Sequence, residues 1–248
     1  WIEPDRWSKL ARPEKADLIT PDTPLYVGLD LAKASDVSCA AMLYDLGEDG
    51  LYLTVRHWLP SEAVKRALSK SESHIYGTLE ENPNVEVQPD SNVTDYAKIR
   101  EFISGIALRG GQLVDTGEGL AKGHNLENVV YDAWNSSQLI MELEGYDGVP
   151  CVPLRQGTVS LNTPTREFEE RVLEGTLYHD GDPFLAWMLG NIVLEVNANG
   201  YIRPNKAKSA DKIDGIAAAV NAFAGYIAAQ EAPEEEDSIP EDWKPRWI

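Results

Sequence analysis

The chain has 248 residues, of which 43% are hydrophobic and 25% charged, values typical of a globular protein with one large or two small domains. Its net charge of −19 argues against broad, non-specific affinity for nucleic acid, because phosphate contacts need lysine and arginine. No apolar run approaches the roughly 20 residues of a membrane-spanning helix, so we expect no membrane contact. The two cysteines, Cys39 and Cys151, are too few for a disulfide framework and predict free thiols in a reducing cytoplasm.

Composition divides the chain into three parts. Residues 1–23 combine prolines and tryptophans with mixed charges, which is typical of an arm leading into a domain, and an ordinary irregular N-terminus is equally compatible. Residues 24–230 carry the strand and helix patterns of one domain. Residues 231–248 form an acidic C-terminal tail with seven acidic and two basic residues. The first residue is not methionine, and we therefore expect a fragment of a longer chain.

The first half of the domain predicts a three-stranded antiparallel meander. Leu25–Ala32 is an apolar strand, and Val37–Asp45 and Leu51–Leu59 follow it as two more. Gly47 and Gly50 mark the turn between the last two strands.

The second half alternates strands and helices, which favours a mixed sheet with helices on its faces. Asn199-Gly200 is the strongest hairpin signal in the chain. After the meander the sequence predicts a helix over 61–71, a loop over 77–92, a helix over 93–109 and an irregular excursion over 110–125. A strand over 128–132, a helix over 136–144 capped by Asn135 or Ser136, and a strand over 149–154 are expected next. The remaining elements are helices over 164–174 and 183–190, a hairpin of 192–197 with 201–203, and a last helix over 211–229.

Three aspartates occupy positions where a carboxylate is costly to bury. Asp30 stands near the end of the first apolar strand, Asp132 ends the strand over 128–132, and Asp214 lies within the last helix. Hard divalent cations such as Mg²⁺ and Mn²⁺ prefer carboxylate oxygens as ligands. If the two strands are neighbours, Asp30 and Asp132 meet at a crevice beyond their carboxyl ends.

The last helix can bring its aspartate close to the sheet, because Asp214 shares a helix face with the small residues Ala218 and Gly225. Asp211, one turn earlier, and Asp36, in the turn after the first strand, are candidate additional ligands. Simpler explanations stay open. An aspartate at a strand end often serves turn chemistry, and Asp211 is also explained as an acid favoured by the helix macrodipole.

The densest basic run lies beside the last helix and consists of Arg203, Lys206, Lys208 and Lys212. Contacts with DNA phosphates are one interpretation of this run. A solvated charged edge is the alternative.

Several segments occur in an order that is more specific than any one of them. They are Gly28–Ala32 with Ser35-Asp36, Val130–Asn135, Thr163–Glu170 with Leu173–Gly175, Asp182–Met188, Asn191–Val193, and Lys208-Ser209 with Lys212–Gly215. In this order, over about residues 24–226, the chain resembles the C-terminal nuclease domain of the large terminase subunit of tailed bacteriophages.

The resemblance implies an α/β, ribonuclease H-like fold, with a mixed central sheet flanked by helices and an added hairpin. It implies a metal-dependent endonuclease that cuts concatemeric double-stranded viral DNA into genome lengths during packaging. Asp30, Asp132 and Asp214 match the family's catalytic, metal-binding acids, and Asp36 matches an acid of some members. Asp211 stands where some members carry histidine. The implied cofactors are two divalent ions, Mg²⁺ or Mn²⁺.

The full-length subunits of this family also carry an N-terminal packaging ATPase. This sequence contains no G-x-x-x-x-G-K-[ST] loop, so residues 1–23 are expected to be the remnant of an interdomain linker. The implied partners are double-stranded viral DNA, the ATPase domain of the same subunit, the portal and the small terminase subunit. The implied location is the host cytoplasm, on the packaging motor at the procapsid.

Two other classes of protein stay open. An actin-like nucleotide-binding kinase or ATPase domain also opens with a glycine–acid strand and a small or hydroxyl loop, as Gly28–Ser35 does. That class needs a second phosphate loop, for which Asp214-Gly215 is a weak candidate. A non-catalytic docking module for the portal or small terminase fits the net charge of −19 better than free DNA binding does. An acidic nuclease remains compatible if metals neutralise its site and a partner delivers the substrate.

Overall fold

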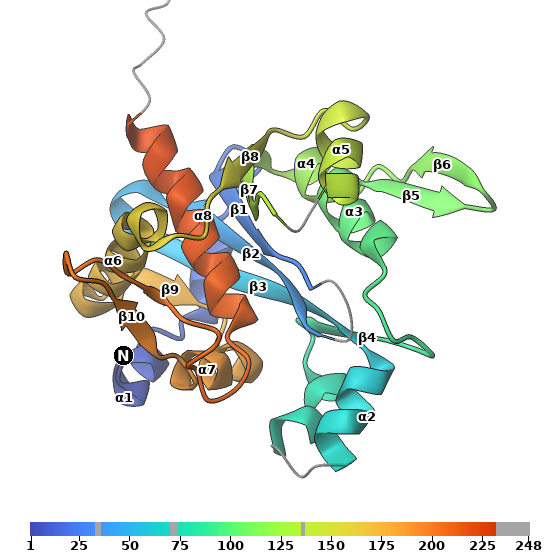
Figure 1. Ribbon diagram of the computed structural model, residues 1–248. Helices are drawn as coiled ribbons and strands as arrows, with labels where there is room; N and C mark the ends of the chain where they lie inside the picture. The colour runs from blue at the N-terminus through green and yellow to red at the C-terminus, as the bar shows by residue number, and fades with distance from the viewer. Residues whose placement is uncertain (33–35, 70–73, 135–136, 232–248) are drawn as a thin grey trace, which may run out of the picture.

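The computed structural model describes residues 1–32, 36–69, 74–134 and 137–231 (Figure 1). Three features expected from the sequence fall wholly or partly outside these residues. They are the turn after the first strand, the helix cap at Asn135 or Ser136, and the acidic tail.

A seven-stranded sheet forms the centre of the described chain. Its strands are β1 (Pro24–Asp30), β2 (Ser38–Asp45), β3 (Leu51–Pro60), β4 (Val85–Gln88), β7 (Asn125–Asp132), β8 (Cys151–Leu154) and β9 (Leu177–His179). The order is β4-β3-β2-β1-β7-β8, and β9 pairs with β3. The pairs β1–β2 and β2–β3 are antiparallel, which confirms the predicted meander, whereas β7 runs parallel to β1 and β8 parallel to β7.

Two hairpins lie outside this sheet. They are β5 (Ile106–Arg109) with β6 (Gln112–Asp115), and β10 (Leu194–Val196) with β11 (Ile202–Pro204). The second hairpin turns at the predicted Asn199-Gly200, where Gly200 has a φ of +76°. The first projects from the body beside the helices of one end, as Figure 1 shows.

Helices cover both faces of the sheet. The α-helices are α1 (Pro4–Lys9), α2 (Ser61–Ser69), α3 (Tyr96–Ser104), α4 (Leu120–Gly123), α5 (Ser137–Gly145), α6 (Thr158–Glu174), α7 (Pro183–Gly190) and α8 (Asp214–Glu231). The 3₁₀ helices are η1 (Pro13–Leu18), η2 (Gly47–Asp49), η3 (His74–Gly77) and η4 (Leu79–Glu81). None of the described helices is both long and apolar enough to cross a lipid bilayer.

The strand period of two sends alternate side chains into two separate cores. On β2, Cys39, Ala41 and Leu43 pack with α6, α7 and α8, whereas Ala40 and Met42 pack with α3, α4 and α5. Burial on both faces explains why the central strands read as nearly continuous apolar runs.

Helix α8 lies unusually close to β1 and β7. A Cβ on Gly28 would collide with the backbone of α8 at Ala218, and one on Gly225 would collide with Asn128. Asn221 Nδ2 donates to Leu29 O at 2.8 Å. The expected face of small residues therefore lets α8 settle directly on the end of β1.

The N-terminal residues pack on the domain. Trp7 is 3% exposed and stacks on His179, with ring centroids 4.0 Å apart. His179 Nε2 donates to Trp7 O at 3.0 Å, and Ala11 forms a β-bridge to the same residue. The division of the chain at residue 23 and its role as linker stay predictions, while the arm itself contributes to the core.

Some element predictions are corrected by the structure. The helix expected over 93–109 ends at Ser104, because Gly105 adopts a φ of +76°, and the chain then enters β5. The expected loop over 77–92 contains β4, and α6 begins at Thr158, with Pro164 inside it. The last helix begins at Asp214, three residues later than expected.

Candidate functional site

Two of the predicted acids end neighbouring parallel strands. Asp30 is the last residue of β1 and Asp132 the last of β7, and the register pairs Gly28 with Val130. Each aspartate lies two residues after its member of this pair, so both carboxylates lie at the same edge of the sheet. The conditional expectation from the sequence is thereby met, because the two strands are neighbours.

The third acid arrives from the other element at this edge. Asp214 is the first residue of α8, and its side chain is 8% exposed. The close packing of α8 on β1 sets its position above the strand end. A carboxylate in the first turn also has a favourable interaction with the positive end of the helix dipole.

A lysine ammonium joins two of these acids. Lys206 Nζ lies 2.7 Å from Asp214 Oδ1 and also contacts Asp30 Oδ2. Asp30 is 13% exposed, and among the described residues no donor other than this ammonium reaches its Oδ2. The side chain of Lys206 is 51% exposed, although its charged end lies among the carboxylates.

The electrostatics of this cluster are those of crowded acids. Burial raises the pKa of Asp30 to about 6; Lys206 opposes this rise, and the charges of Asp214 and Asp132 add to it. Burial lowers the pKa of Lys206, but the carboxylates of Asp30 and Asp214 outweigh burial and hold that pKa above its ordinary value. Lys206 is therefore charged at neutral pH.

Two hollows meet at Lys206. The larger, about 300 Å³, is lined by Asp30, Asp132 and Lys206. The smaller, about 260 Å³, is lined by Lys206, Asp214, Asp36 and Asp211. All five predicted acids thus border one composite cleft, with the ammonium between its two parts.

The acids are near one another without forming a ready-made cage. Among the described residues, no three His, Cys, Asp or Glu side chains stand close enough together to coordinate one metal ion as they lie. Asp36 Oδ1 is 2.8 Å from Lys212 Nζ, and Asp211 Oδ1 accepts from the backbone of Lys212 at 2.8 Å. Lysines therefore contact the acids on both sides of the cleft.

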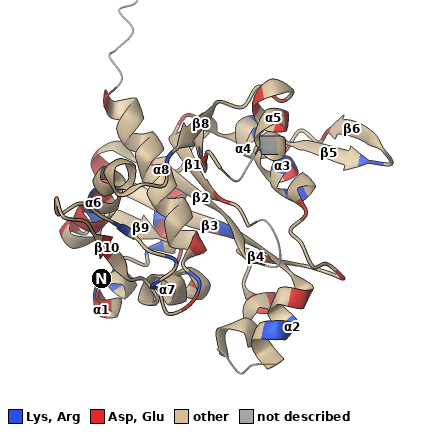
Figure 2. Cartoon of the chain, in the orientation of Figure 1, with Lys and Arg blue, Asp and Glu red and all other residues tan. Residues whose placement is uncertain are grey.

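The predicted basic run is largely engaged with acids of the chain itself. Arg203 Nη2 pairs with Glu195 at 2.7 Å, while Lys206 and Lys212 pair with acids of the cleft. Figure 2 shows acidic and basic segments interspersed around α6, β10 and α7. Arg203 also lines the larger hollow, and its contact with phosphates stays a prediction, as does that of Lys208.

Two polar residues of the cleft region were given no role from the sequence. Gln156 lines the larger hollow, and its Nε2 donates to Asn221 Oδ1 at 3.3 Å. Asn221 in turn holds Leu29 O, one residue before Asp30. A polar residue on the inner face of an otherwise apolar helix was the signal for Asn221, whereas nothing local in the sequence marks Gln156.

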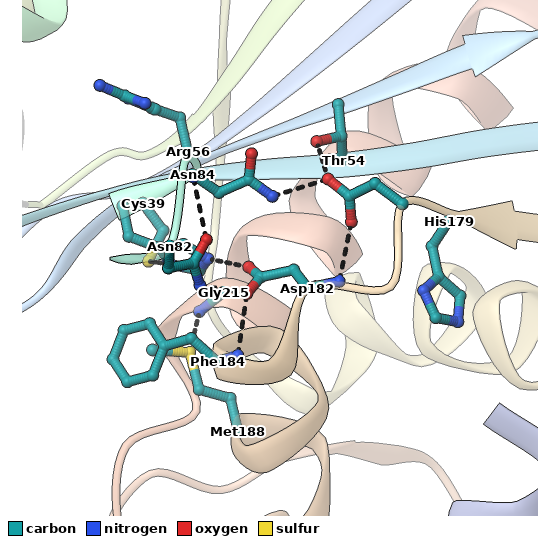
Figure 3. A network of polar contacts seen from close by, with 12 residues as sticks. Cys39, Thr54, Arg56, Asn82, Asn84, His179, Asp182, Phe184, Met188 and Gly215 are labelled. Carbon is teal, nitrogen blue, oxygen red and sulfur yellow. Dashed lines mark hydrogen bonds and ion pairs between the residues drawn. The ribbon is translucent and has the colours of Figure 1, made fainter. Parts of the chain in front are cut away.

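A second buried polar network, drawn in Figure 3, lies beneath the start of α8. His57 Nε2 donates to Asp182 Oδ2 at 2.8 Å, and Asn82 Nδ2 donates to Asp182 Oδ1 at 2.6 Å. Cys39 Sγ lies 3.2 Å from His57 Nδ1. The Cys–His–Asp order resembles a nucleophile with its base, but these side chains are buried and line neither hollow. Burial also raises the pKa of the Cys39 thiol, which keeps it protonated.

This network supports the site from below. Asp182 is the N-cap of α7, accepting from Phe184 N at 2.8 Å. Met188, on the same helix, accepts from Gly215 N at 3.1 Å, next to Asp214. His57 and Asp182 are 125 residues apart in the chain, so no local sequence pattern marks them as partners.

The topology and the cleft define the class. An antiparallel β1–β3 meander extended by parallel β7 and β8, with helices on both faces and acids at the strand ends, is a ribonuclease H-like architecture. The predicted fold class, including the added hairpin, is confirmed. The chain belongs to the family described as "Terminase large subunit, endonuclease domain", which matches residues 1–231. The resemblance drawn from the ordered motifs is thus confirmed.

Two curated relatives match most of the chain. "Protein YmfN" of Escherichia coli K12 is 25% identical over 205 residues, which are 80% of this chain and 42% of YmfN. The large terminase subunit of Enterobacteria phage HK97 is 23% identical over 216 residues, 83% of this chain and 38% of that subunit. The chain therefore spans about two fifths of the length of these relatives.

A solved structure shares the fold. The crystal structure of the HK97 large terminase matches with a TM-score of 0.73 and 19% identity, over 90% of this chain and 43% of that one. Family membership favours the nuclease over the actin-like alternative considered from the sequence.

Proposed function

We propose that this domain is a metal-dependent DNA endonuclease that cuts concatemeric double-stranded viral DNA during genome packaging. The observation that carries the proposal is the convergence of Asp30, Asp132 and Asp214 on one cleft, from β1, β7 and α8. Membership of the terminase endonuclease family supports the same activity.

The donor set fits divalent metal ions. Asp30 and Asp214 already share one cationic group, the ammonium of Lys206, which stands in for a metal ion. Asp132 borders the same hollow as Asp30, and the oxygens of all three are ligands that Mg²⁺ and Mn²⁺ prefer. Asp30, Asp132 and Asp214 are the residues that would hold the two proposed ions. Two such ions, when bound, activate a water molecule for in-line attack on the phosphorus and stabilise the leaving oxygen.

The chain's own residues prepare the cleft for this chemistry. Asp30 is desolvated and crowded by two other acids, so its carboxylate favours a cation strongly. Asp36 and Asp211 border the smaller hollow and are proposed as additional ligands. Arg203 lines the larger hollow and Lys212 the smaller, and together with Lys206 and Lys208 they are proposed to contact the DNA backbone.

The biological setting is proposed from the family. The substrate is double-stranded viral DNA, and the partners are the packaging ATPase domain of the same subunit, the portal and the small terminase subunit. The setting is a packaging motor in the host cytoplasm. With a net charge of −19, the domain is expected to depend on these partners to bring DNA to the cleft.

Cleavage of supercoiled plasmid in Mg²⁺ or Mn²⁺ tests the proposal. We expect cutting by the wild-type chain, none with a chelator, and a loss of at least ~100-fold in Asp30→Asn, because one of the proposed metal ligands is gone. Asp17→Asn changes an exposed aspartate outside the cleft and should cut like wild type. Undiminished cutting by folded Asp30→Asn contradicts the proposal, whereas binding to portal protein without any cutting would favour the docking module.

A further inference from the structure

Lys206 places a positive charge between two of the acids proposed as metal ligands. Its Nζ contacts Asp30 Oδ2 and lies 2.7 Å from Asp214 Oδ1. The same side chain borders both hollows of the cleft. The ammonium therefore takes the place between two carboxylates that a bound cation would take.

Hydrogen bonds anchor the backbone that carries Lys206, whereas its side chain is held through its ammonium. Asn205 N donates to Val193 O at 2.9 Å, and Ser209 N donates to Asn205 O at 3.0 Å. Ala210 N donates to Asn191 O at 3.2 Å, which fixes the far end of the segment. Because the Lys206 side chain is 51% exposed, its charged end can leave the acids by rotation about side-chain bonds while the backbone stays in place.

The negative charges of Asp30 and Asp214 explain why a cation is needed between them. Two carboxylates with low exposure repel each other, and the separation of both from water increases that repulsion. One ammonium relieves this repulsion in the metal-free chain. A divalent ion would relieve it more fully, but it needs the same oxygens and the same space.

We propose that Lys206 is a tethered competitor of the divalent metal, which must leave Asp30 and Asp214 before a metal ion can bind them. The inference rests on the proposed function, since it takes these two acids as metal ligands. Lys206 then weakens metal binding to the free domain. Its released ammonium stays at the edge of the cleft, where a DNA phosphate offers it a new partner, so that DNA and metal favour each other's binding.

Calorimetric titration of the metal-free chain with Mn²⁺ tests the competition. Lys206→Met keeps the length of the side chain and removes its charge. We expect Mn²⁺ to bind this variant about tenfold more tightly, because the charge-assisted contacts with two acids no longer have to be broken. Without metal its Tm should fall, and the rise in Tm on adding Mn²⁺ should exceed that of wild type.

Lys122→Met is the matched control. It removes another lysine–aspartate pair outside the cleft, between Lys122 of α4 and Asp115 of the β5–β6 hairpin, which lie 2.8 Å apart. Its Mn²⁺ affinity should equal that of wild type. If Lys206→Met binds Mn²⁺ no more tightly than this control does, the competitor role is overturned.

Asp30→Asn separates a failure of this inference from a failure of the proposed function. If Asp30→Asn binds Mn²⁺ as wild type does, the metal-ligand assignment fails, and the proposed nuclease site fails with it. If Asp30→Asn loses binding while Lys206→Met matches wild type, only the role of Lys206 is wrong.

The unaltered chain provides a second measurement if Lys206→Met does not fold. Brief acetylation with acetic anhydride, read by peptide mass spectrometry, reports how freely each lysine amine reacts. Without metal, Lys206 should react more slowly than Lys122, and saturating Mn²⁺ should raise its rate several-fold. An unchanged rate at a Mn²⁺ concentration that raises the Tm would overturn the proposal.

Discussion

Two buried aspartates in neighbouring parts of the molecule have pKa values that move in opposite directions. Asp182 lies beneath the start of α8 with a side chain that is 0% exposed. Burial raises its pKa, but hydrogen bonds from His57, Asn82 and Phe184 N outweigh burial, and the net pKa is lowered. The hydrogen bonds to Asp182 thus compensate the cost of burying its negative charge.

Asp30 shows the contrary arrangement. Burial raises its pKa to about 6, and of the groups around it only Lys206 opposes the rise, while Asp214 and Asp132 add to it. Among the described groups, no donor other than the Lys206 ammonium reaches its Oδ2. The difference teaches how to separate the two roles. A buried carboxylate that accepts hydrogen bonds from several fixed donors has a structural role. A carboxylate whose one cationic partner is a lysine side chain can exchange that partner for a bound metal ion.

The largest effect on stability should come from removing Asp182, the acceptor at the centre of the buried polar network. Asp182→Ala leaves Asn82, His57 and Phe184 N without their acceptor and removes the N-cap of α7. We expect a loss of about 3–5 kcal/mol in the free energy of unfolding, because three buried donors lose their partner at once. Urea unfolding followed by circular dichroism measures this loss.

Asp17→Ala is the control for that experiment. Asp17 is exposed, and its replacement should change the free energy of unfolding by less than ~0.5 kcal/mol. If Asp182→Ala were as stable as this control, the contrast between the two buried acids would lose its basis.

Replacing Asp30 should have the opposite sign. In the metal-free chain at pH 7, Asp30→Asn should be more stable than wild type, because the folded state no longer holds an ionised group that it disfavours. The same variant should lose plasmid cleavage, so stability and activity move apart at this position.

The pH dependence follows from the raised pKa of Asp30. Between its unfolded value of 3.8 and its folded value of about 6, the folded chain binds a proton that the unfolded chain has released. Wild-type stability relative to Asp30→Asn should therefore fall as pH rises from about 4 through 6, and become level above about pH 7. Urea unfolding of both proteins across this range checks it, and a difference that does not change with pH would contradict it.

The acids and their strands could be predicted because their signals are local. Asp30 and Asp132 stand at the ends of apolar runs, and the small residues of the last helix indicate a close approach to a strand. The approach is real, since Gly28 and Gly225 leave no room for a Cβ against their neighbours. The residue pattern alone left the role of these acids open, and the resemblance to the terminase family predicts that they bind metal.

Other features depend on partners far away in the sequence. The apolar stripe over 93–109 continues past Gly105, so the stripe does not show where α3 ends. The helix ends because Gly105 adopts a left-handed backbone conformation. Strands β4 and β9 have four and three residues, and each forms by pairing with β3. Sequence placed Lys206 beside the acids, but the direction of its side chain follows from how 205–213 folds back. The same holds for Asp182 and His57, which meet across 125 residues.

The smallest effect should come from the outer part of the complete network. Thr54 Oγ1 donates to Asp180 Oδ2 at 2.6 Å, and Asn84 Nδ2 donates to the same oxygen at 2.7 Å (Figure 3). Thr54→Val keeps the shape of the side chain and removes one of two donors, so we expect a loss of about 1 kcal/mol, seen as a fall of a few degrees in Tm. The rise in Tm on adding Mn²⁺ should match that of wild type, because Asp180 does not border the cleft. A changed Mn²⁺ response would mean that the two regions are coupled, and that the acids of the cleft depend on the network beneath them for more than support.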